Sequence, residues 1–344
     1  MTERVLVAMS GGVDSSVAAA LLVEAGHDVV GATLKLWGGE SDSGCCSVAD
    51  VDDARNVARR LGIEHHVFNF GDDFDEHVVE PYVADHAAGR TPNPCIECNR
   101  HLKFDRLLRR ADALGFDAVA TGHHARIVVR ADGPPRVARG VDPAKDQSYV
   151  VHVLTEGAMG RVRFPVGHLT KAEVRGEATR LGLATADKPD SQDVCFITAT
   201  AGRAAFLSSR ISTRPGTVVD RQGRTMGSVP AVELVTIGQR RGLGLQGGGD
   251  PQYVVAVDGP GATVTVGCPA DLLVDHLRLE AVAWVGAPVR GPLLAQVSAH
   301  GEPRPCCVDD GTVRFAHRQR RVAPGQSVVL YEGDLVVGSG LAAS

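Results

Sequence analysis

Over the first 121 residues, short apolar runs alternate with segments rich in helix formers, and no other feature constrains the fold as strongly. The apolar runs, predicted as strands, are residues 4–9, 28–36, 63–70 and 116–121. The predicted helices are residues 16–24, 51–61, 74–86 (interrupted near Pro81) and 99–114. Repeated strand–helix units predict an α/β fold, a doubly wound parallel sheet covered by helices on both faces. Ligands of such sheets bind beyond the carboxyl ends of the strands.

The rest of the chain is predicted to be richer in strands. Residues 127–139 resemble a hairpin, and a helix is predicted from Thr170, which has capping-box spacing with Glu173, to near Gly182. From about residue 214, Gly, Pro and Asp separate short apolar runs, which predicts two β-rich modules with a boundary near residue 273. We therefore divide the 344 residues into domains 1–205, 206–273 and 274–344.

Composition excludes several classes of protein. With 44% hydrophobic and 22% charged residues, a disordered or collagen-like chain is ruled out. The net charge of -5 means that any surface for nucleic acid must be local. We see no signal peptide and no apolar run near the roughly 18 residues of a membrane span, so we expect a soluble, cytoplasmic protein without a membrane partner. In that compartment the eight cysteines are expected to be thiols, metal ligands or redox catalysts.

A glycine- and serine-rich loop, Ser10-Gly11-Gly12-Val13-Asp14-Ser15-Ser16, follows the first predicted strand and enters the first predicted helix. Its glycines permit a tight turn, in which backbone N–H groups and the helix N-terminus face an anion. The loop lacks the lysine of a Walker A motif and does not have the dinucleotide-binding spacing. An ordinary capped turn is the alternative, but the full string favours phosphate binding, with Asp14 as a candidate Mg²⁺ ligand.

Three cysteines lie in segments that suggest chemistry. Cys95 and Cys98 occur in Thr-Pro-Asn-Pro-Cys-Ile-Glu-Cys-Asn, and Cys195 occurs in Asp-Ser-Gln-Asp-Val-Cys-Phe. Asn99 is predicted to cap the next helix, and a cysteine at a helix N-terminus has a lowered pKa that favours the thiolate. A lone Cys-x-x-Cys is also half of a zinc site, but no second pair completes it. Cys195 by itself is equally compatible with a buried, structural thiol.

These motifs together resemble a known family. Ser-Gly-Gly-Val-Asp-Ser is the signature of the PP-loop ATP pyrophosphatase superfamily, whose members cleave ATP between the α and β phosphates and adenylate a substrate oxygen. The whole series resembles the bacterial tRNA-specific 2-thiouridylase family. In chain order the further matching segments are residues 89–99, 120–126, 145–149, 164–175, 190–197, 236–244 and 324–340.

The resemblance implies a fold and an activity. The fold is a Rossmann-like PP-loop domain followed by two smaller β-rich modules, the last of them a β-barrel. The activity is ATP-dependent 2-thiolation of the wobble uridine (position 34) of tRNA by a tRNA-uridine 2-sulfurtransferase. AMP is transferred to the C2 oxygen of uridine, sulfur then replaces that oxygen, and AMP and pyrophosphate are released. The implied cofactors are ATP and Mg²⁺, and the implied partners are tRNA and a protein that donates persulfide sulfur.

The resemblance also assigns roles to residues. It makes Cys195 the persulfide carrier and Cys98 the nucleophile that releases the sulfur, leaving a transient disulfide between them. The residues implied to bind ATP are Ala8, Met9, Ser10, Gly11, Gly12, Val13, Asp14, Ser15, Leu34 and Gly122. The residues implied to contact tRNA are Asn93, Pro94, Cys95, His123, Lys145, Asp146, Gln147 and Gln326.

Alternatives remain open at this stage. Cys95 stands where some relatives carry an aspartate, and Cys95, Cys98 and Cys195 are compatible with an iron–sulfur cluster, which we rank below the persulfide route. The chain is also compatible with another PP-loop ligase or a non-catalytic RNA-binding protein. Two groups of basic residues are predicted to contact RNA phosphates. They are Arg100, Lys103, Arg106, Arg109 and Arg110, and Arg314, Arg318, Arg320 and Arg321.

Overall fold

The computed structural model describes residues 2–37, 47–129, 133–190, 194–197, 202–245 and 250–343. It divides into two compact units, which are described separately. Unit 1 comprises Met1–Val79, Pro94–Thr200 and Asp334–Val336, and unit 2 comprises Glu80–Asn93, Ala201–Gly333 and Val337–Ser344. Residues 191–193 of the segment that leads to Cys195 lie outside the described residues.

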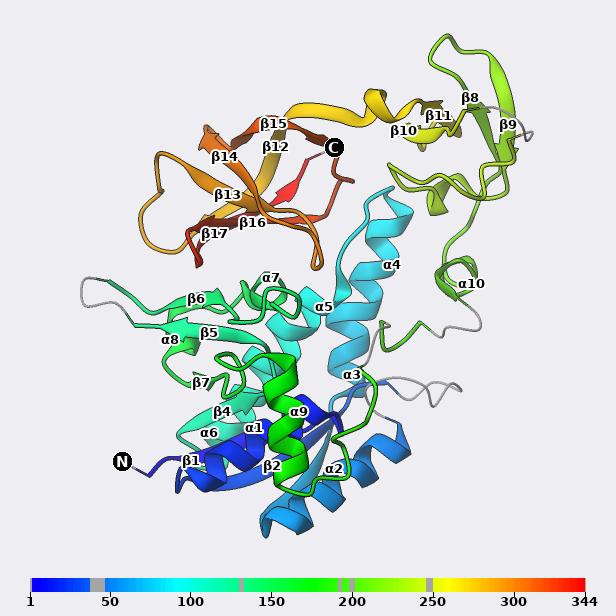
Figure 1. The fold of residues 1–344 in the computed structure, drawn as a ribbon. Coiled ribbons are helices and arrows are strands. Elements are labelled where there is room, and N and C mark those ends of the chain that lie inside the picture. Colours follow the sequence, from blue (N-terminus) through cyan, green and yellow to red (C-terminus); the bar gives the residue numbers. More distant parts are fainter. Residues whose placement is uncertain are drawn as a thin grey trace. The chain divides into compact units, whose positions relative to one another are not determined.

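Unit 1 is built on a parallel five-stranded sheet (Figure 1). Its strands are β1 (Arg4–Ala8), β2 (Asp28–Lys35), β3 (Glu64–Asn69), β4 (Ala118–Thr121) and β7 (Val162–Arg163), in the order β3-β2-β1-β4-β7. The four predicted strands are confirmed, and β7 was not predicted. The strand order reverses between β1 and β4, so their carboxyl ends flank the position where such sheets bind ligands.

Helices cover this sheet. They are α1 (Val13–Glu24), α2 (Val48–Leu61), α3 (Gly71–Phe74), α5 (Pro94–Glu97), α6 (Leu107–Ala113), α7 (Ser148–Val151), α8 (Glu156–Met159) and α9 (Lys171–Arg180), with two π-helices, η1 (Asp75–Val79) and η2 (Cys98–Arg106). Helix α1 lies beside α9 and is apolar on most sides because it is enclosed in the core that includes Val5, Val17 and Val174 (Figure 1). The predicted capping box of Thr170 and Glu173 is present at the start of α9.

Two helix predictions need correction. The backbone stays helical through Pro81, into α4 (Glu80–Ala87). Pro81 is the second residue of α4 and follows the π-helix η1, whose wider turn relieves the clash that a proline ring makes with the preceding turn of an α-helix. The helix predicted from residue 99 instead begins at Pro94, a favoured first position. Asn99 therefore does not cap it; it lies inside η2 and donates to the Val150 carbonyl at 2.8 Å.

A small antiparallel hairpin also belongs to unit 1. Strands β5 (Ala125–Val128) and β6 (Arg136–Arg139) pair as the sequence predicted, and residues 130–132 between them lie outside the described part. Along the described residues, no helix has the length and apolar character needed to cross a membrane.

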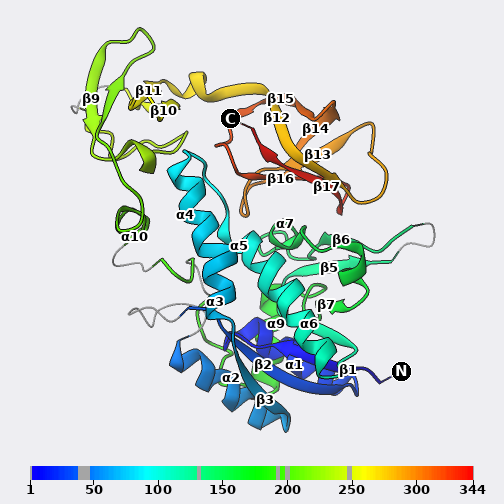
Figure 2. The same cartoon turned by 180° about the vertical axis from the view of Figure 1, so that it is seen from behind.

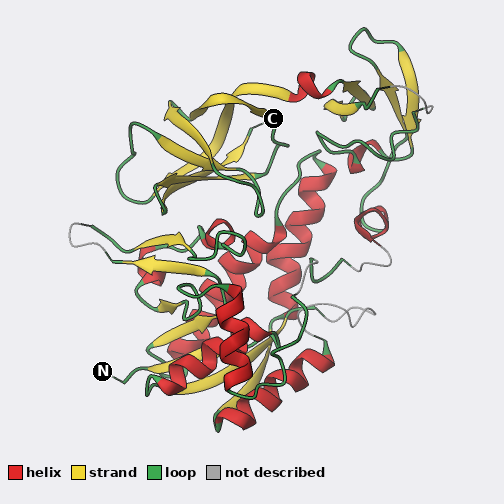
Figure 3. Cartoon of the chain, viewed as in Figure 1, coloured by secondary structure: helices red, strands yellow, loops and turns green. Residues whose placement is uncertain are grey.

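Unit 2 consists mainly of strands, in contrast to the mixture of helix and strand in unit 1 (Figure 3). Apart from α4, it has α10 (Gly202–Ser208), the short 3₁₀ helices Val232–Leu234 and Pro269–Leu272, and a four-stranded sheet in the order β10-β11-β8-β9. These strands are β8 (Gly216–Val219), β9 (Thr225–Val229), β10 (Tyr253–Asp258) and β11 (Thr263–Gly267). Their inward side chains, among them Val218, Val254 and Val264, form a separate core.

The last module is a closed barrel, as predicted. Its strands pair in the order β12-β15-β14-β13-β16-β17, and β12 pairs again with β17. They are β12 (Leu273–Trp284), β13 (Leu293–Gln296), β14 (Arg304–Asp309), β15 (Thr312–Arg320), β16 (Ser327–Glu332) and β17 (Leu335–Ala342). Strands β9, β12, β13 and β14 were not predicted. Figure 2 shows the barrel strands from the opposite side.

Candidate active site around the phosphate loop

The loop between β1 and α1 is a tight turn held by its own side chains. Gly11 has a φ of 73°, and a Cβ there would collide with the backbone carbonyl of Asp50. The hydroxyls of Ser15 and Ser16 donate to the Gly12 carbonyl at 3.1 and 2.8 Å, so in this structure they stabilise the turn. No side chain caps α1, which leaves the N–H groups of its first turn for a ligand.

Gly122 brings the end of β4 against this loop. A Cβ on Gly122 would lie 2.5 Å from the Ser15 nitrogen and 2.6 Å from the Asp14 carbonyl carbon. Only glycine permits this approach, because both neighbours are backbone atoms. Of the other residues assigned to ATP, Ala8 ends β1, Met9 follows it, and Leu34 lies near the carboxyl end of β2. Their contact with nucleotide stays a prediction.

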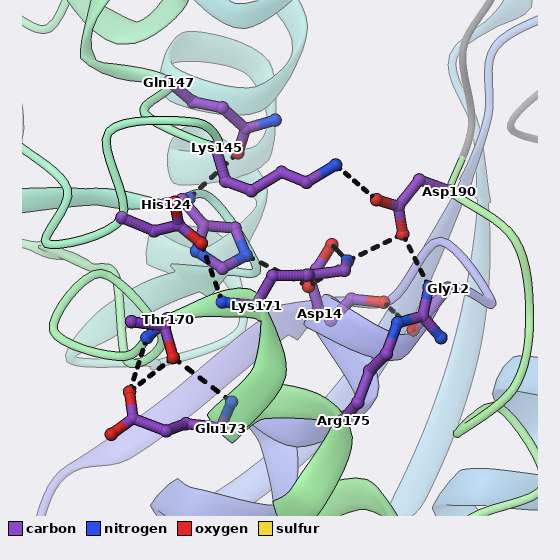
Figure 4. Close-up of polar contacts among 12 residues, drawn as sticks. Gly12, Asp14, His124, Lys145, Gln147, Thr170, Lys171, Glu173, Arg175 and Asp190 are labelled. Carbon is purple, nitrogen blue, oxygen red and sulfur yellow. Dashed lines mark hydrogen bonds and ion pairs between the residues drawn. The ribbon is translucent and has the colours of Figure 1, made fainter.

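Asp14, which the sequence suggested as a Mg²⁺ ligand, forms ion pairs with two residues from other elements (Figure 4). The Lys171 ammonium, at the start of α9, donates to its two oxygens at 2.7 and 2.8 Å. The His124 ring Nε2 lies 3.1 Å from Oδ1. Burial opposes ionisation of Asp14, but His124 and Lys171 outweigh it and lower the pKa of this carboxyl.

Asp190 shares Lys171 with Asp14 (Figure 4). Its carboxylate accepts from Lys171 and Lys145, each at 2.8 Å, and from Arg175 at 3.1 Å. Burial opposes ionisation here too, but Lys145 and Lys171 lower the pKa of Asp190 to about 2. The residue five positions before Cys195 is therefore tied to the phosphate loop through one lysine.

Lys188 braces the loop from another side. Its ammonium donates to the Gly11 carbonyl at 3.0 Å and to Asp50 and Asp53 at 2.7 and 2.5 Å. Together these charged groups form what we call the phosphate-loop network: Asp14, Asp50, Asp53, Lys145, Lys171, Arg175, Lys188 and Asp190. Sequence reasoning found only Asp14 and Lys145. The capping box at Thr170 already placed Lys171 at a helix N-terminus, and this position could have marked Lys171 as a candidate site residue.

The two proposed thiols are each packed near the same helical element. Cys98 begins η2 and is 8% exposed, Cys195 is half-buried, and both are thiols in this structure. Phe196, next to Cys195, packs on Phe74 at a ring-centroid distance of 5.7 Å. His77, in η1 directly after Phe74, stacks on His101 of η2 at 4.8 Å. The α3–η1 element thus contacts both the Cys195 segment and the helix that carries Cys98.

The iron–sulfur alternative gains no support. Cys95, Cys98 and Cys195 all belong to the described residues, and within these no group of three or more His, Cys, Asp or Glu residues could hold a metal ion. Cys95 is exposed in the first turn of α5 and Cys98 is buried.

Several residues assigned to tRNA have structural partners. Asp146 accepts from the Gly140 and Ser148 backbones at 3.0 Å, and Gln147 accepts from the His124 backbone at 2.9 Å. His123 is buried, which lowers its pKa well below 6.5. Contact with tRNA stays a prediction for all of these.

The remaining tRNA candidates are divided between the two units. Pro94 begins α5 in unit 1 and Asn93 belongs to unit 2. Within unit 2, the Gln326 amide donates to the Thr91 carbonyl. Sequence reasoning assigned Asn93 and Gln326 separately, and the structure links Gln326 to the segment that precedes Asn93. Their contact with RNA also stays a prediction.

Three family models match the chain. Models described as "tRNA methyl transferase HUP domain", "tRNA methyl transferase PRC-barrel domain" and "Aminomethyltransferase beta-barrel domain" match residues 3–199, 204–268 and 274–342. They follow one another along the chain and together extend over nearly all of it.

Curated relatives match over the same extent. The chain is 45% identical over 367 residues to the tRNA-specific 2-thiouridylase MnmA of Roseiflexus castenholzii, with 98% of each chain covered. It is 48% identical over 355 residues to the protein of the same name from Mycobacteroides abscessus, again with 98% of each covered. A solved 4-thiouridine synthetase–RNA complex with bound ATP is 18% identical, with a TM-score of 0.39 over 56% of this chain and 45% of that one. At that TM-score the likeness carries no argument about this site.

Proposed function

The chain belongs to the tRNA-specific 2-thiouridylase family, and from this premise we propose that it uses ATP to replace the C2 oxygen of a tRNA uridine by sulfur. It is a tRNA sulfurtransferase. The observation that carries the proposal is the 45–48% identity over 98% of the chain to relatives of that name. The phosphate loop at the point where the strand order reverses supports it physically.

The first step activates a poor electrophile. The C2 carbonyl of uridine resists substitution because its oxygen is a bad leaving group, and transfer of AMP to that oxygen makes it a good one. The N–H groups at the start of α1 and the Lys171 and Lys188 ammonium groups are placed to stabilise the departing pyrophosphate. Phosphate oxygens would then replace the carboxylates that now hold these lysines.

Asp14 is the residue that would hold Mg²⁺. One carboxylate together with phosphate oxygens and water is the usual ligand set of this ion, so the single carboxylate at the loop fits it. When bound, the ion neutralises phosphate charge. When the Lys171 ammonium turns to the polyphosphate, the Asp14 carboxylate becomes available to Mg²⁺.

The second step delivers sulfur. We assign the persulfide to Cys195, whose outer sulfur attacks C2 as the AMP oxygen leaves. The Cys98 thiolate attacks the inner sulfur of Cys195, which breaks the S–S bond and forms a Cys98–Cys195 disulfide. A two-electron reductant then restores both thiols, and a persulfide donor protein reloads Cys195. The target is assigned as the wobble uridine, which must leave its stack to react, and the reaction is placed in the cytoplasm.

Mass spectrometry of tRNA nucleosides tests the reaction. With ATP, Mg²⁺, tRNA and a persulfide source, wobble uridine is expected to gain sulfur in place of oxygen, and pyrophosphate is expected to appear only with tRNA. A methyl gain would instead support the reaction named in the family models. Pyrophosphate release without tRNA dependence would favour another PP-loop ligase, and no release would favour a non-catalytic RNA-binding protein.

Cysteine variants test the assignment of roles. Cys98→Ser and Cys195→Ser are each expected to lower thiolation about 10³-fold or more while tRNA-dependent pyrophosphate release continues, because adenylation needs neither thiol. Cys268→Ser, at an exposed cysteine of unit 2, is the matched control and should thiolate normally. Thiolation at the wild-type rate by both active-site variants would reject the persulfide route.

A further inference from the structure

The strand at the edge of the parallel sheet in unit 1 is β3 (Figure 2). A cleft lies beside it. Residues 67–70 line one side, and Arg106, Arg109 and Arg110, from the end of η2 and from α6, line the other. Its volume is about 410 Å³. We call it the arginine–aromatic cleft, and the activity proposed above assigns it no role.

The strand side of the cleft presents stacked rings. Phe68 lies 6.3 Å from the His66 ring at an interplanar angle of 16°, and 6.1 Å from the Phe70 ring at 20°. These three residues alternate along the strand, so their side chains share one face of the sheet. His66 is exposed, Phe68 is half-buried and Phe70 is buried. The result is a row of nearly parallel rings that ends in solvent.

The helix side places guanidinium groups over these rings. Arg110 lies 5.2 Å above the Phe68 ring and Arg106 lies 5.7 Å above the Phe70 ring, both in cation–π range. Arg106 pairs with Asp73 and Arg109 with Asp105, but the two arginine side chains are 52% and 71% exposed. Ion pairs this exposed are weak and exchange readily with other anions. Arg110 forms no ion pair with any residue that the structure describes.

Such a surface suits nucleic acid. Flat aromatic faces next to planar guanidinium groups bind unstacked bases and the phosphates beside them. On a chain with a net charge of -5, three arginines at one cleft form a local cationic site. A volume of about 410 Å³ accommodates a nucleotide.

The cleft also lies within reach of the assigned chemistry. Cys98 and Arg110 belong to one uninterrupted helical run, η2 followed by α6. Twelve residues of such a helix advance roughly 15–18 Å along its axis. Single-stranded RNA whose reactive base is at Cys98 would therefore reach the cleft within a few nucleotides.

We propose that the arginine–aromatic cleft binds a single-stranded segment of the tRNA substrate, with a base stacked on Phe68 and phosphates on Arg106, Arg109 and Arg110. The proposal rests on the tRNA activity proposed above and adds a contact that does not touch the phosphate loop. An acidic protein, such as the sulfur donor, is the competing occupant. It would match the positive charge but would have no use for a row of stacked rings.

Binding measurements with two variants test the proposal. Arg110→Ala is expected to weaken tRNA binding about tenfold and to reduce the slope of log K against log[salt] by about 0.7, the share of one phosphate on a single strand. Phe68→Ala is expected to weaken binding about tenfold with an unchanged salt slope, because it removes stacking alone. Arg59→Ala, at an exposed arginine of α2 in the same unit, is the matched control and should bind normally. Binding of an ATP analogue should be unchanged in all three, which shows that the fold is intact.

The outcomes separate the possible errors. Wild-type tRNA affinity and salt slope in both Arg110→Ala and Phe68→Ala would overturn the proposal while leaving tRNA thiolation in place. The variants could instead bind tRNA normally and turn over slowly only when a protein donates the persulfide, and not with inorganic sulfide. That result would assign the cleft to the donor protein and would also overturn the proposal. Failure of the wild-type protein to bind or thiolate tRNA would instead overturn the proposed function itself.

Discussion

The phosphate-loop network and the arginine–aromatic cleft both gather cations in unit 1, but they compensate them differently. Lys171 in the network is 12% exposed and lies between the carboxylates of Asp14 and Asp190. Arg106 and Arg109 in the cleft are 52% and 71% exposed, and each pairs with a single carboxylate, Asp73 or Asp105. The charges around Lys171 are therefore preorganised, and salt weakens their interactions little. The charges of the cleft face solvent, and salt weakens their interactions more. A small, highly charged ligand fits the first arrangement, and a long polyanion fits the second.

The largest expected effect comes from adding one methyl group at the loop. Gly122→Ala would place a Cβ within 2.5 Å of the Ser15 nitrogen, so the loop or the end of β4 must shift. We expect tRNA-dependent pyrophosphate release to fall about 10³-fold, with tRNA affinity nearly unchanged. Gly157→Ala, whose Cβ would meet nothing within 4 Å, is the control. Normal pyrophosphate release by Gly122→Ala would show that the loop tolerates the shift and is not preorganised.

Removing the shared lysine should have the next largest effect. Lys171→Met takes a cation from the departing pyrophosphate and leaves Asp14 and Asp190 without it. Pyrophosphate release is expected to fall about 10²-fold, again with little change in tRNA affinity. Combining Lys171→Met with Asp190→Asn should give less than the sum of the two losses, because the residues share one ion pair. Full additivity would mean that the two act independently.

The acidic partners should differ in their contribution to stability. Lys145 and Lys171 hold the pKa of Asp190 at about 2. The charged carboxylate therefore stabilises the folded state at pH values above 3.8, the ordinary pKa of an aspartate. Asp190→Asn should therefore lose about 2 kcal/mol at neutral pH, and the loss should shrink as the pH falls from about 4 towards 2. Asp73→Asn, at the exposed Arg106 pair, should lose less than about 1 kcal/mol. Urea unfolding measures the free energy of unfolding of both variants. Equal losses would show that the network and the cleft do not differ in how strongly their carboxylates are held.

The smallest effect has the opposite sign. Asp105→Asn frees Arg109 from its exposed ion pair and removes a negative charge from the cleft. We expect tRNA affinity to rise about two- to threefold in a binding assay at low salt, because the phosphate no longer competes with a carboxylate. Weaker binding would indicate that Asp105 holds Arg109 in place for the RNA.

Local patterns predicted much of unit 1. The spacing of apolar residues located four of the five strands of its parallel sheet, and the glycine–serine string located the loop. Several short elements were missed: β7 has two residues, β13 has four, and polar residues stand at both ends of β14. The π-helical form of residues 98–106 was also unpredictable, because it depends on tertiary packing around Cys98 and Asn99.

Convergence of distant residues was beyond the reach of local patterns. Lys171 and Asp14 are 157 positions apart and meet only because α9 packs on α1. Arg110 and Phe68 meet because the long side chain of Arg110 extends from α6 to the ring of Phe68 on the edge strand. The sequence predicted a helix rich in arginines, and the structure shows that two of these arginines lie over phenylalanine rings. The roles of Cys98 and Cys195 remain predictions from family resemblance.

The pairing of β12 with β17 has a consequence for how recognition can change over evolutionary time. A closed ring of strands leaves few unpaired backbone groups, and the pairing of Leu335 in β17 with Ala138 in β6 is one exception, so most of the module's surface is presented by side chains. Outward-facing substitutions can therefore retune the module's preferences one residue at a time without weakening the ring that displays them.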